Sequence, residues 1–185
     1  MKNSEFIIGK VPITKEEVRS ISIAKLELSR AKKFIDIGSG TGSITVEAGL
    51  NYPNLKVASV ETNELAYELT KKNILKFELE NITQIKAMAP INIDRFEKVD
   101  AIFLGGTKDN LKEILEWSYE TLREGGKIVS NFILIDNFYS CREIMKEVGF
   151  KKLETVQLSV SRLEKLGKGE YFKPENPIFI LSGEK

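Results

Sequence analysis

Short apolar segments alternate with longer amphipathic segments along most of the chain, and this alternation constrains the fold more than any other feature. The short segments are rich in β-branched and aromatic residues, as buried strands are. The longer segments have helical spacing; in residues 64–78, Leu65, Leu69 and Leu75 form the expected apolar stripe. This order predicts βαβ units and a mostly parallel sheet with helices on both faces. The first five strands are expected at residues 33–37, 56–61, 82–88, 99–105 and 125–134.

The end of the chain breaks this alternation. Two further apolar segments, residues 151–163 and 176–183, have no helical segment between them. A hairpin is the simplest connection for such neighbours, and it makes one strand antiparallel to the next. We therefore predict an α/β, Rossmann-like fold whose seven-stranded sheet is mostly parallel with one antiparallel strand. The plain dinucleotide-binding pattern ends instead with helices and a sixth parallel strand.

Length and composition narrow the possible functions. The 185 residues suit one domain, and a formal net charge of +1 argues against a protein that wraps nucleic acid through global charge. The chain has no histidine and a single cysteine, so histidine metal sites, cysteine clusters and Ser-His-Asp catalysis are excluded. No apolar run reaches the roughly 20 residues of a membrane helix. We expect one cytoplasmic domain over residues 1–185, with no metal, membrane or nucleic-acid partner.

Three glycines follow the first expected strand at alternate positions, in the stretch FIDIGSGTGSI. Gly38, Gly40 and Gly42 lie between that strand and the next helix, where ligands bind in open α/β sheets. Glycine allows positive φ and removes the Cβ that would block a ligand, while the helix start offers free N–H groups. Asp36 precedes the loop, and Glu61, which ends the second strand, can accept hydrogen bonds from ribose hydroxyls. The spacing is G-x-G-x-G rather than the G-x-G-x-x-G of the NAD fingerprint.

These features together resemble the class I methyltransferases that use S-adenosylmethionine (SAM). The stretches VPITKEEVR, DIGSGTGSITVEA, AMAP, DAIFLGG, GGKIVSNFI and VQLSVSR narrow the resemblance to the decarboxylating cobalt-precorrin C15-methyltransferases of cobalamin (vitamin B12) biosynthesis. The similarity runs from about residue 9 to residue 183. It implies a SAM-dependent methyltransferase that methylates C15 of cobalt-precorrin-6B and removes CO2 from the ring C acetate, which gives cobalt-precorrin-7.

The resemblance also implies a set of SAM-binding residues. The glycine loop would lie against the methionine and ribose parts of SAM, Glu61 would hold the ribose, and the N-terminal segment and helix, residues 1–30, would cover the site. Met88 stands where the family usually has an aspartate; a thioether packs against an adenine face but is a poor acceptor. The implied cofactor-binding residues are Thr14, Asp36, Gly38, Ser39, Gly40, Thr41, Gly42, Glu61, Met88 and Ala89. Thr14 and Glu17 also have the spacing of a capping box, which predicts a helix start at Thr14.

The implied substrate is a cobalt-containing tetrapyrrole with many carboxylates, and C15 of such a ring can attack the SAM methyl group in line. The enzyme's main task is then placement and desolvation, which requires no strong base. Gly105 and Gly106 are expected to leave room for a flat ring at the catalytic centre, and Asn131 to hydrogen-bond the substrate. Lys15, Arg19 and Arg162 are the expected partners of its carboxylates.

The resemblance implies a homo-oligomer, in particular a homotetramer with the late hairpin at an interface, and a separate C5-methyltransferase as pathway partner. Three alternatives stay open at this point. The first is a class I methyltransferase with another substrate, such as a tRNA base, a protein or a small acid. The second is a non-catalytic binding module that keeps the SAM fold. The third is an NAD-linked oxidoreductase, which the glycine spacing and the closing hairpin disfavour.

Overall fold

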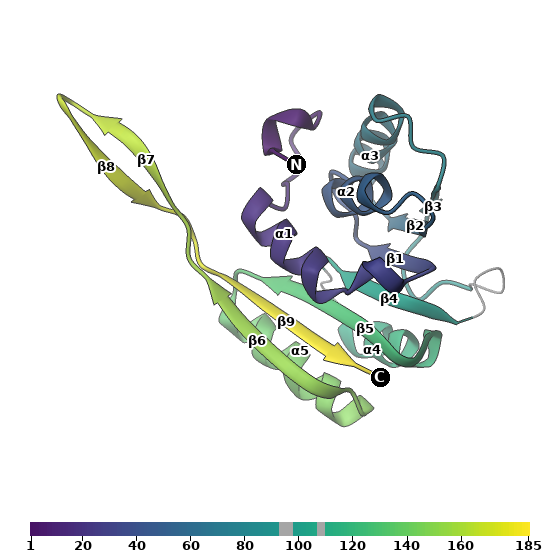
Figure 1. The fold of residues 1–185 in the computed structure, drawn as a ribbon. Coiled ribbons are helices and arrows are strands. Elements are labelled where there is room, and N and C mark those ends of the chain that lie inside the picture. The colour runs from purple at the N-terminus through teal and green to yellow at the C-terminus, as the bar shows by residue number, and fades with distance from the viewer. Residues whose placement is uncertain (93–97, 107–109) are drawn as a thin grey trace.

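A computed structural model describes residues 1–92, 98–106 and 110–185 (Figure 1). Seven strands form one sheet in the order β3-β2-β1-β4-β5-β9-β6. The pairs β1–β2, β1–β4, β2–β3 and β4–β5 are parallel, whereas β9 runs antiparallel to both β5 and β6. The predicted sheet is therefore confirmed. Its strands are β1 (Lys33–Ile37), β2 (Lys56–Glu61), β3 (Ile82–Lys86), β4 (Val99–Leu104), β5 (Leu122–Phe132), β6 (Lys151–Leu158) and β9 (Ile178–Glu184).

Helices cover both faces of the sheet, as predicted (Figure 1). Alternate residues of β1 point to opposite sides, so that Phe34 belongs to the core beneath the first helices and Ile35 to the core on the other side. One face carries α1 (Glu16–Lys25), α2 (Ser43–Asn51) and α3 (Glu64–Lys76), and the other carries α4 (Leu111–Thr121) and α5 (Ile135–Val148). Single-turn helices lie at Asn3–Glu5 (η1) and Leu28–Arg30 (η2).

The chain between β6 and β9 forms a two-stranded ribbon instead of a simple hairpin turn. It consists of β7 (Ser161–Leu166) and β8 (Gly169–Pro174), which pair antiparallel and project from the body of the molecule (Figure 1). Gly167 takes φ +61° in the two-residue turn at its tip, a conformation that glycine adopts at little cost. We call this ribbon the arm. The expected strand at residues 151–163 is thus two strands, β6 in the sheet and β7 in the arm.

Among the residues that the structure describes, no helix is long and apolar enough to cross a membrane. The same residues contain no group of three or more His, Cys, Asp or Glu side chains placed to hold a metal ion.

Candidate active site

The strand order of the sheet reverses between β1 and β4, which is the topological switch point, and the glycine stretch lies there. The chain passes from β1 outward through β2 and β3, and then returns to the other side of β1 as β4. The backbone N–H of Gly105, just after β4, donates to the carbonyl of Ile37 at the end of β1 over 2.7 Å. The loops after β1 and β4 therefore meet at the carboxyl edge of the sheet, where α/β proteins bind ligands.

The glycine loop, residues 38–42, explains why three glycines alternate there. Gly38, Gly40 and Gly42 all have left-handed backbone conformations, with φ of +70°, +59° and +75°. Such angles are strained for residues that carry a Cβ. A Cβ on Gly42 would also lie 2.7 Å from Cγ2 of Thr70 on α3. The loop is thus tightly fixed by its own backbone and by α3.

Glu61 holds the glycine loop against the end of β2. Its Oε2 accepts the backbone N–H of Gly40 over 2.9 Å, and its Oε1 accepts those of Thr62 and Asn63 over 2.8 Å each. The residue as a whole is only 9% exposed. Because a carboxylate offers about four acceptor positions, Oε2 keeps one position for a ligand hydroxyl. A second hydroxyl would have to replace one of the three backbone donors.

Asp36 lies buried beneath the loop. Its Oδ2 accepts the hydroxyl of Thr45 on α2 over 2.5 Å, while its Oδ1 has no hydrogen-bond partner among the described residues. Burial raises the pKa of this carboxyl to about 7; the hydrogen bonds from Thr45 lower it, and the charge of Glu61 raises it further. An unpartnered oxygen at this depth costs free energy unless a proton or a further donor satisfies it.

The segment after β3 lies next to Glu61. The N–H of Ala87 donates to the backbone carbonyl of Glu61 over 3.2 Å. Met88, which follows, is 70% exposed, whereas Ala89 is buried and its carbonyl accepts the side-chain N–H of Asn110 over 2.7 Å. Met88 and Ala89 are thus brought beside the expected ribose position. Their contact with adenine remains a prediction.

The two glycines after β4 have different surroundings. A Cβ on Gly105 would lie 2.5 Å from the carbonyl oxygen of Gly38, so a glycine is needed here for close contact with the glycine loop. The expected room for a flat ring at Gly105 stays a prediction. A Cβ on Gly106 would meet no atom within 4 Å among the described residues. Asn131, near the end of β5, is half-buried, and its Nδ2 lies 2.9 Å from the hydroxyl oxygen of Ser22 on α1.

The expectation that Arg19 binds substrate is wrong. Its side chain is 0% exposed, and its Nε donates to Glu47 of α2 over 2.5 Å. Its Nη1 donates to the carbonyl of Thr14 and to Oδ1 of Asn3, and its Nη2 donates to the carbonyl of Met1. Its guanidinium lies 4.8 Å from the ring centre of Phe6. Arg19 faces the protein interior because Glu47, 28 residues later in sequence, neutralises it there. It fixes the N-terminal segment.

The other two expected substrate cations lie at the base of the arm. Arg162 of β7 makes two 2.9 Å hydrogen bonds to Glu17 and one of 3.1 Å to Glu175, which also pairs with Lys15 over 2.6 Å. The hydrogen bond to Lys15 is the main cause that lowers the pKa of Glu175. Lys15 and Arg162 are brought together, with their charges balanced by two carboxylates.

The start of α1 also differs from the expectation. The helix begins at Glu16 with Lys15 as its N-cap, and no side chain caps it. Glu17 is engaged by Arg162 instead of completing a capping box with Thr14. The segment that precedes α1 passes close to the glycine loop, since an ideal Cβ on Gly40 would lie 3.7 Å from the carbonyl oxygen of Pro12. Thr14 is the last residue of this segment and is half-buried.

Sequence reasoning missed the polar residues that support the glycine loop from the helices. Thr70 of α3 donates to the carbonyl of Gly40 over 2.9 Å, and Asn73, one turn later, donates to that of Thr41 over 2.9 Å. Both are fully buried. The available signal was their position on the same helical face as Ala66 and Leu69, which makes them polar residues in an apolar stripe.

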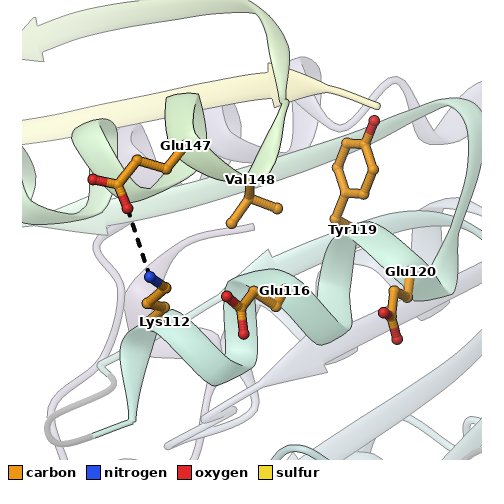
Figure 2. A pocket seen from close by; sticks show the side chains of 6 residues that line it. All are labelled: Lys112, Glu116, Tyr119, Glu120, Glu147 and Val148. Carbon is orange, nitrogen blue, oxygen red and sulfur yellow. Dashed lines mark ion pairs between the residues drawn. The ribbon is translucent and has the colours of Figure 1, made fainter.

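A cleft of about 270 Å³ lies elsewhere, between α4 and α5 (Figure 2). It is on the opposite face of the sheet from α1, α2 and α3 (Figure 1). Lys112 and Glu147 face each other across it at 3.7 Å. Its lining residues include none of those expected to bind cofactor or substrate; they are Lys112, Glu116, Tyr119, Glu120, Glu147 and Val148.

Comparison with known proteins identifies the family. The model of the precorrin methyltransferase domain matches residues 8–185. The chain belongs to the precorrin methyltransferase family. A curated relative from Salmonella typhimurium, named cobalt-precorrin-6B C(15)-methyltransferase (decarboxylating), is 40% identical over 186 residues, which is 100% of this chain and 96% of the relative. One from Sulfurisphaera tokodaii, with the same name marked probable, is 43% identical over 99% of this chain and 96% of its own length.

The structure of another precorrin methyltransferase agrees with this assignment. The crystal structure named precorrin-6y C5,15-methyltransferase, from Geobacter metallireducens GS-15, superimposes with a TM-score of 0.91 at 30% identity, covering 100% of this chain and 96% of that one. The geometry also fits the methyl donor that the family implies. Three left-handed glycines leave alternate positions of the loop without a side chain, and the carboxyls of Asp36 and Glu61 each keep an acceptor position.

Proposed function

We propose that this chain is a SAM-dependent methyltransferase of cobalamin biosynthesis, which methylates C15 of cobalt-precorrin-6B and removes CO2 from the ring C acetate to give cobalt-precorrin-7. The observation that carries this proposal is 40% identity, over the whole chain, to a relative with that activity in its name. The proposal is also supported by the fixed glycine loop, which lies at the topological switch point of the sheet between β1 and β4. A cytoplasmic location fits this biosynthetic role.

The cofactor would lie between the loops that follow β1, β2 and β3. Thr14, Gly38, Ser39, Gly40, Thr41 and Gly42 would surround its methionine and ribose parts, Glu61 would accept a ribose hydroxyl, and Met88 and Ala89 would lie beside adenine. SAM supplies an activated methyl group on a sulfonium, which is a good leaving group. The buried carboxyl of Asp36 lies beneath the loop, where a nearby positive charge would favour its ionised form.

The residues of this chain would contribute placement and exclusion of water. A new bond forms between C15 and the methyl carbon as the bond from that carbon to sulfur breaks, and the electron pair of the broken bond stays on sulfur. An in-line attack of this kind gains most from correct orientation. The exposed Gly106 and the half-buried Asn131 are the proposed contacts at this centre, whereas Gly105 supports the glycine loop.

Decarboxylation breaks the bond between the acetate CH2 and its carboxylate. The electron pair passes into the conjugated macrocycle, CO2 leaves, and the remaining carbon takes up a proton from solvent. The protein need only hold the acetate in a suitable place. Lys15 and Arg162 could bind substrate carboxylates there, provided that these replace Glu175 and Glu17 as partners.

The arm provides the proposed contact between copies of the chain in a homotetramer. Leu163 and Phe172 lie directly opposite each other on the ribbon and are 56% and 68% exposed. Within the described residues, β7 and β8 pair only with each other, so both outer edges are unpaired. A second copy of the arm can cover these side chains and edges. The methylation at C5 would require a separate enzyme.

Transfer of an isotopically labelled methyl group tests the proposal. The purified chain is incubated with labelled SAM and cobalt-precorrin-6B, and the tetrapyrrole is recovered. We expect the label in the tetrapyrrole in proportion to the protein added. Bound SAM with no transfer would point to another methyl acceptor, and absence of SAM binding would contradict the proposal.

A further inference from the structure

Asn73 is a fully buried side chain that touches two separate parts of the candidate active site. It lies in α3 and is 0% exposed. Its Oδ1 accepts the N–H of Ile7 over 2.7 Å, and its Nδ2 donates to the carbonyl of Ile7 over 3.1 Å and to that of Thr41 over 2.9 Å. One side-chain amide thus joins the N-terminal segment, residues 1–14, to the glycine loop.

The N-terminal segment depends on such contacts because it contains little regular structure. Its only described helix is the single turn Asn3–Glu5. Phe6 packs in a small core with Val46 and Ile74. Arg19 fixes the two ends of the segment through Asn3 and Thr14. The paired bonds between Asn73 and Ile7 fix its middle, much as a neighbouring strand would.

The segment passes over the glycine loop after it leaves Asn73. An ideal Cβ on Gly40 would lie 3.8 Å from Cγ1 of Val11 and 3.7 Å from the carbonyl oxygen of Pro12. Thr70, one turn before Asn73, holds the carbonyl of Gly40. The peptide groups that carry the carbonyls of Gly40 and Thr41 therefore respond to α3. A ligand that orders the glycine loop would therefore also order Asn73, the side chain that is hydrogen-bonded to Ile7.

We propose that Asn73 is a positioning residue that couples the glycine loop to the N-terminal segment, so that a cofactor bound on the loop also fixes the segment lying over it. The inference rests on the proposed SAM site and adds a residue that acts through Thr41 and Ile7. A buried asparagine that serves stability alone would show no such coupling.

The chain offers a matched control for that simpler role. Asn81 also uses its Nδ2 as a donor to backbone carbonyls, those of Gly49 at 3.0 Å and Leu55 at 3.0 Å. It precedes β3 at Ile82, at the edge of the parallel sheet opposite to the glycine loop. Asn73→Asp and Asn81→Asp both remove donors to backbone carbonyls while they preserve side-chain size.

The test measures the SAM dissociation constant by calorimetry and amide hydrogen exchange at Ile7, with and without SAM. For the unmodified chain we expect SAM to slow exchange at Ile7. For Asn73→Asp we expect affinity about ten-fold weaker, faster exchange without SAM, and loss of the SAM-dependent slowing. For Asn81→Asp we expect a lower melting temperature with unchanged SAM affinity and slowing.

The outcomes separate this inference from the proposed function. Asn73→Asp with unchanged affinity and slowing, or equal losses of both in the two variants, would overturn the coupling while SAM binding to the unmodified chain stood. Unchanged exchange at Ile7 on SAM binding to the unmodified chain would also overturn it. A chain that binds no SAM would overturn the proposed function together with the coupling.

Discussion

At the scale of single residues, the candidate site depends on two carboxyl groups in different surroundings. Glu61 accepts three backbone N–H groups, which hold its carboxylate in one orientation. Within the described part of the chain, Asp36 has the single side-chain donor Thr45 and an unpartnered oxygen, so burial dominates and raises its pKa. The difference gives Glu61 the character of a fixed acceptor and makes Asp36 sensitive to pH and to nearby positive charge.

Replacement of Glu61 tests the ribose assignment. We expect Glu61→Ala to weaken SAM binding about ten-fold or more, because a hydrogen bond to a charged group contributes about 1.5–3 kcal/mol. Calorimetry measures the affinity, and circular dichroism checks that the fold survives. Glu61→Gln is the control that retains the size of the side chain. Unchanged affinity in a folded Glu61→Ala variant would remove the ribose assignment.

Asp36 gives the free energy of unfolding a pH dependence. Its carboxyl titrates near pH 4 in an unfolded chain and at about 7 in the fold, so the folded state binds the proton more tightly. The stabilising contribution is complete below about pH 4 and is lost as pH rises to about 7. Urea unfolding across this range should show stability falling by at most about 1.4 kcal/mol per pH unit relative to Asp36→Asn. Parallel pH profiles for the two proteins would contradict the raised pKa.

A matched pair of glycine substitutions tests whether a ligand approaches the glycine loop closely. Gly40→Val and Gly167→Val introduce a branched side chain at nearly equal φ, +59° and +61°. Gly40 lies in the glycine loop, where the ligand is expected, whereas Gly167 lies at the tip of the arm, where an added Cβ would meet no atom within 4 Å among the described residues. We expect Gly40→Val to abolish SAM binding in a fluorescence titration and Gly167→Val to leave it unchanged. Equal affinities would show that the loop has room for a side chain.

At the scale of elements, the sequence predicted the sheet better than it predicted the surfaces of the helices. Residues 33–37 and 56–61 are β1 and β2 with the expected bounds, since buried strands are marked by continuous apolar residues. The apolar stripe predicted for helix α3 was right only in part: Leu69 is buried, whereas Leu65 and Leu75 are 69% and 68% exposed. Its buried face includes Thr70 and Asn73, whose partners lie in distant segments that local periodicity does not reveal.

The arm and Arg19 show why long-range contacts escape prediction from one sequence. The two strands of the arm do not pack on the core of the described structure, so no buried face requires apolar residues at every second position. Its apolar residues Leu163 and Phe172 are exposed. From the sequence alone, Arg19 looks like a solvent-exposed helix residue. Its burial becomes clear only from its contacts with Glu47 and with the carbonyl of Thr14. The loop glycines and Glu61 were found because their spacing follows from local backbone geometry.

The apolar face of the arm should control assembly. We expect Leu163→Asp combined with Phe172→Asp to shift the protein from oligomer to monomer in sedimentation experiments, because two charges would face a buried contact. SAM affinity should change little. Glu164→Gln, on the neighbouring position that points to the other face of the ribbon, is the control and should keep the oligomer. An oligomer that survives the double substitution would place the interface elsewhere.

At the scale of the whole molecule, most of the proposed SAM contacts precede most of the proposed substrate contacts along the chain. The expected SAM contacts come from the N-terminal segment and the loops after β1, β2 and β3, which α2 and α3 support. Of the proposed substrate contacts, Gly106, Asn131 and Arg162 come from β4 onward and from the arm, whereas Lys15 directly precedes α1. Ion pairs of Arg162 with Glu17 and of Lys15 with Glu175 join the base of the arm to the start of α1. Under the proposed assembly through the arm, contacts between copies would act on the start of α1 through these ion pairs.

The most direct test of the account is the mass of the product that the purified chain forms from cobalt-precorrin-6B and SAM. The account predicts a single product that has gained one methyl group and lost one CO2, since one protein carries both reactions. A product with the methyl group and the intact acetate, or an unchanged substrate in the presence of bound SAM, would contradict it.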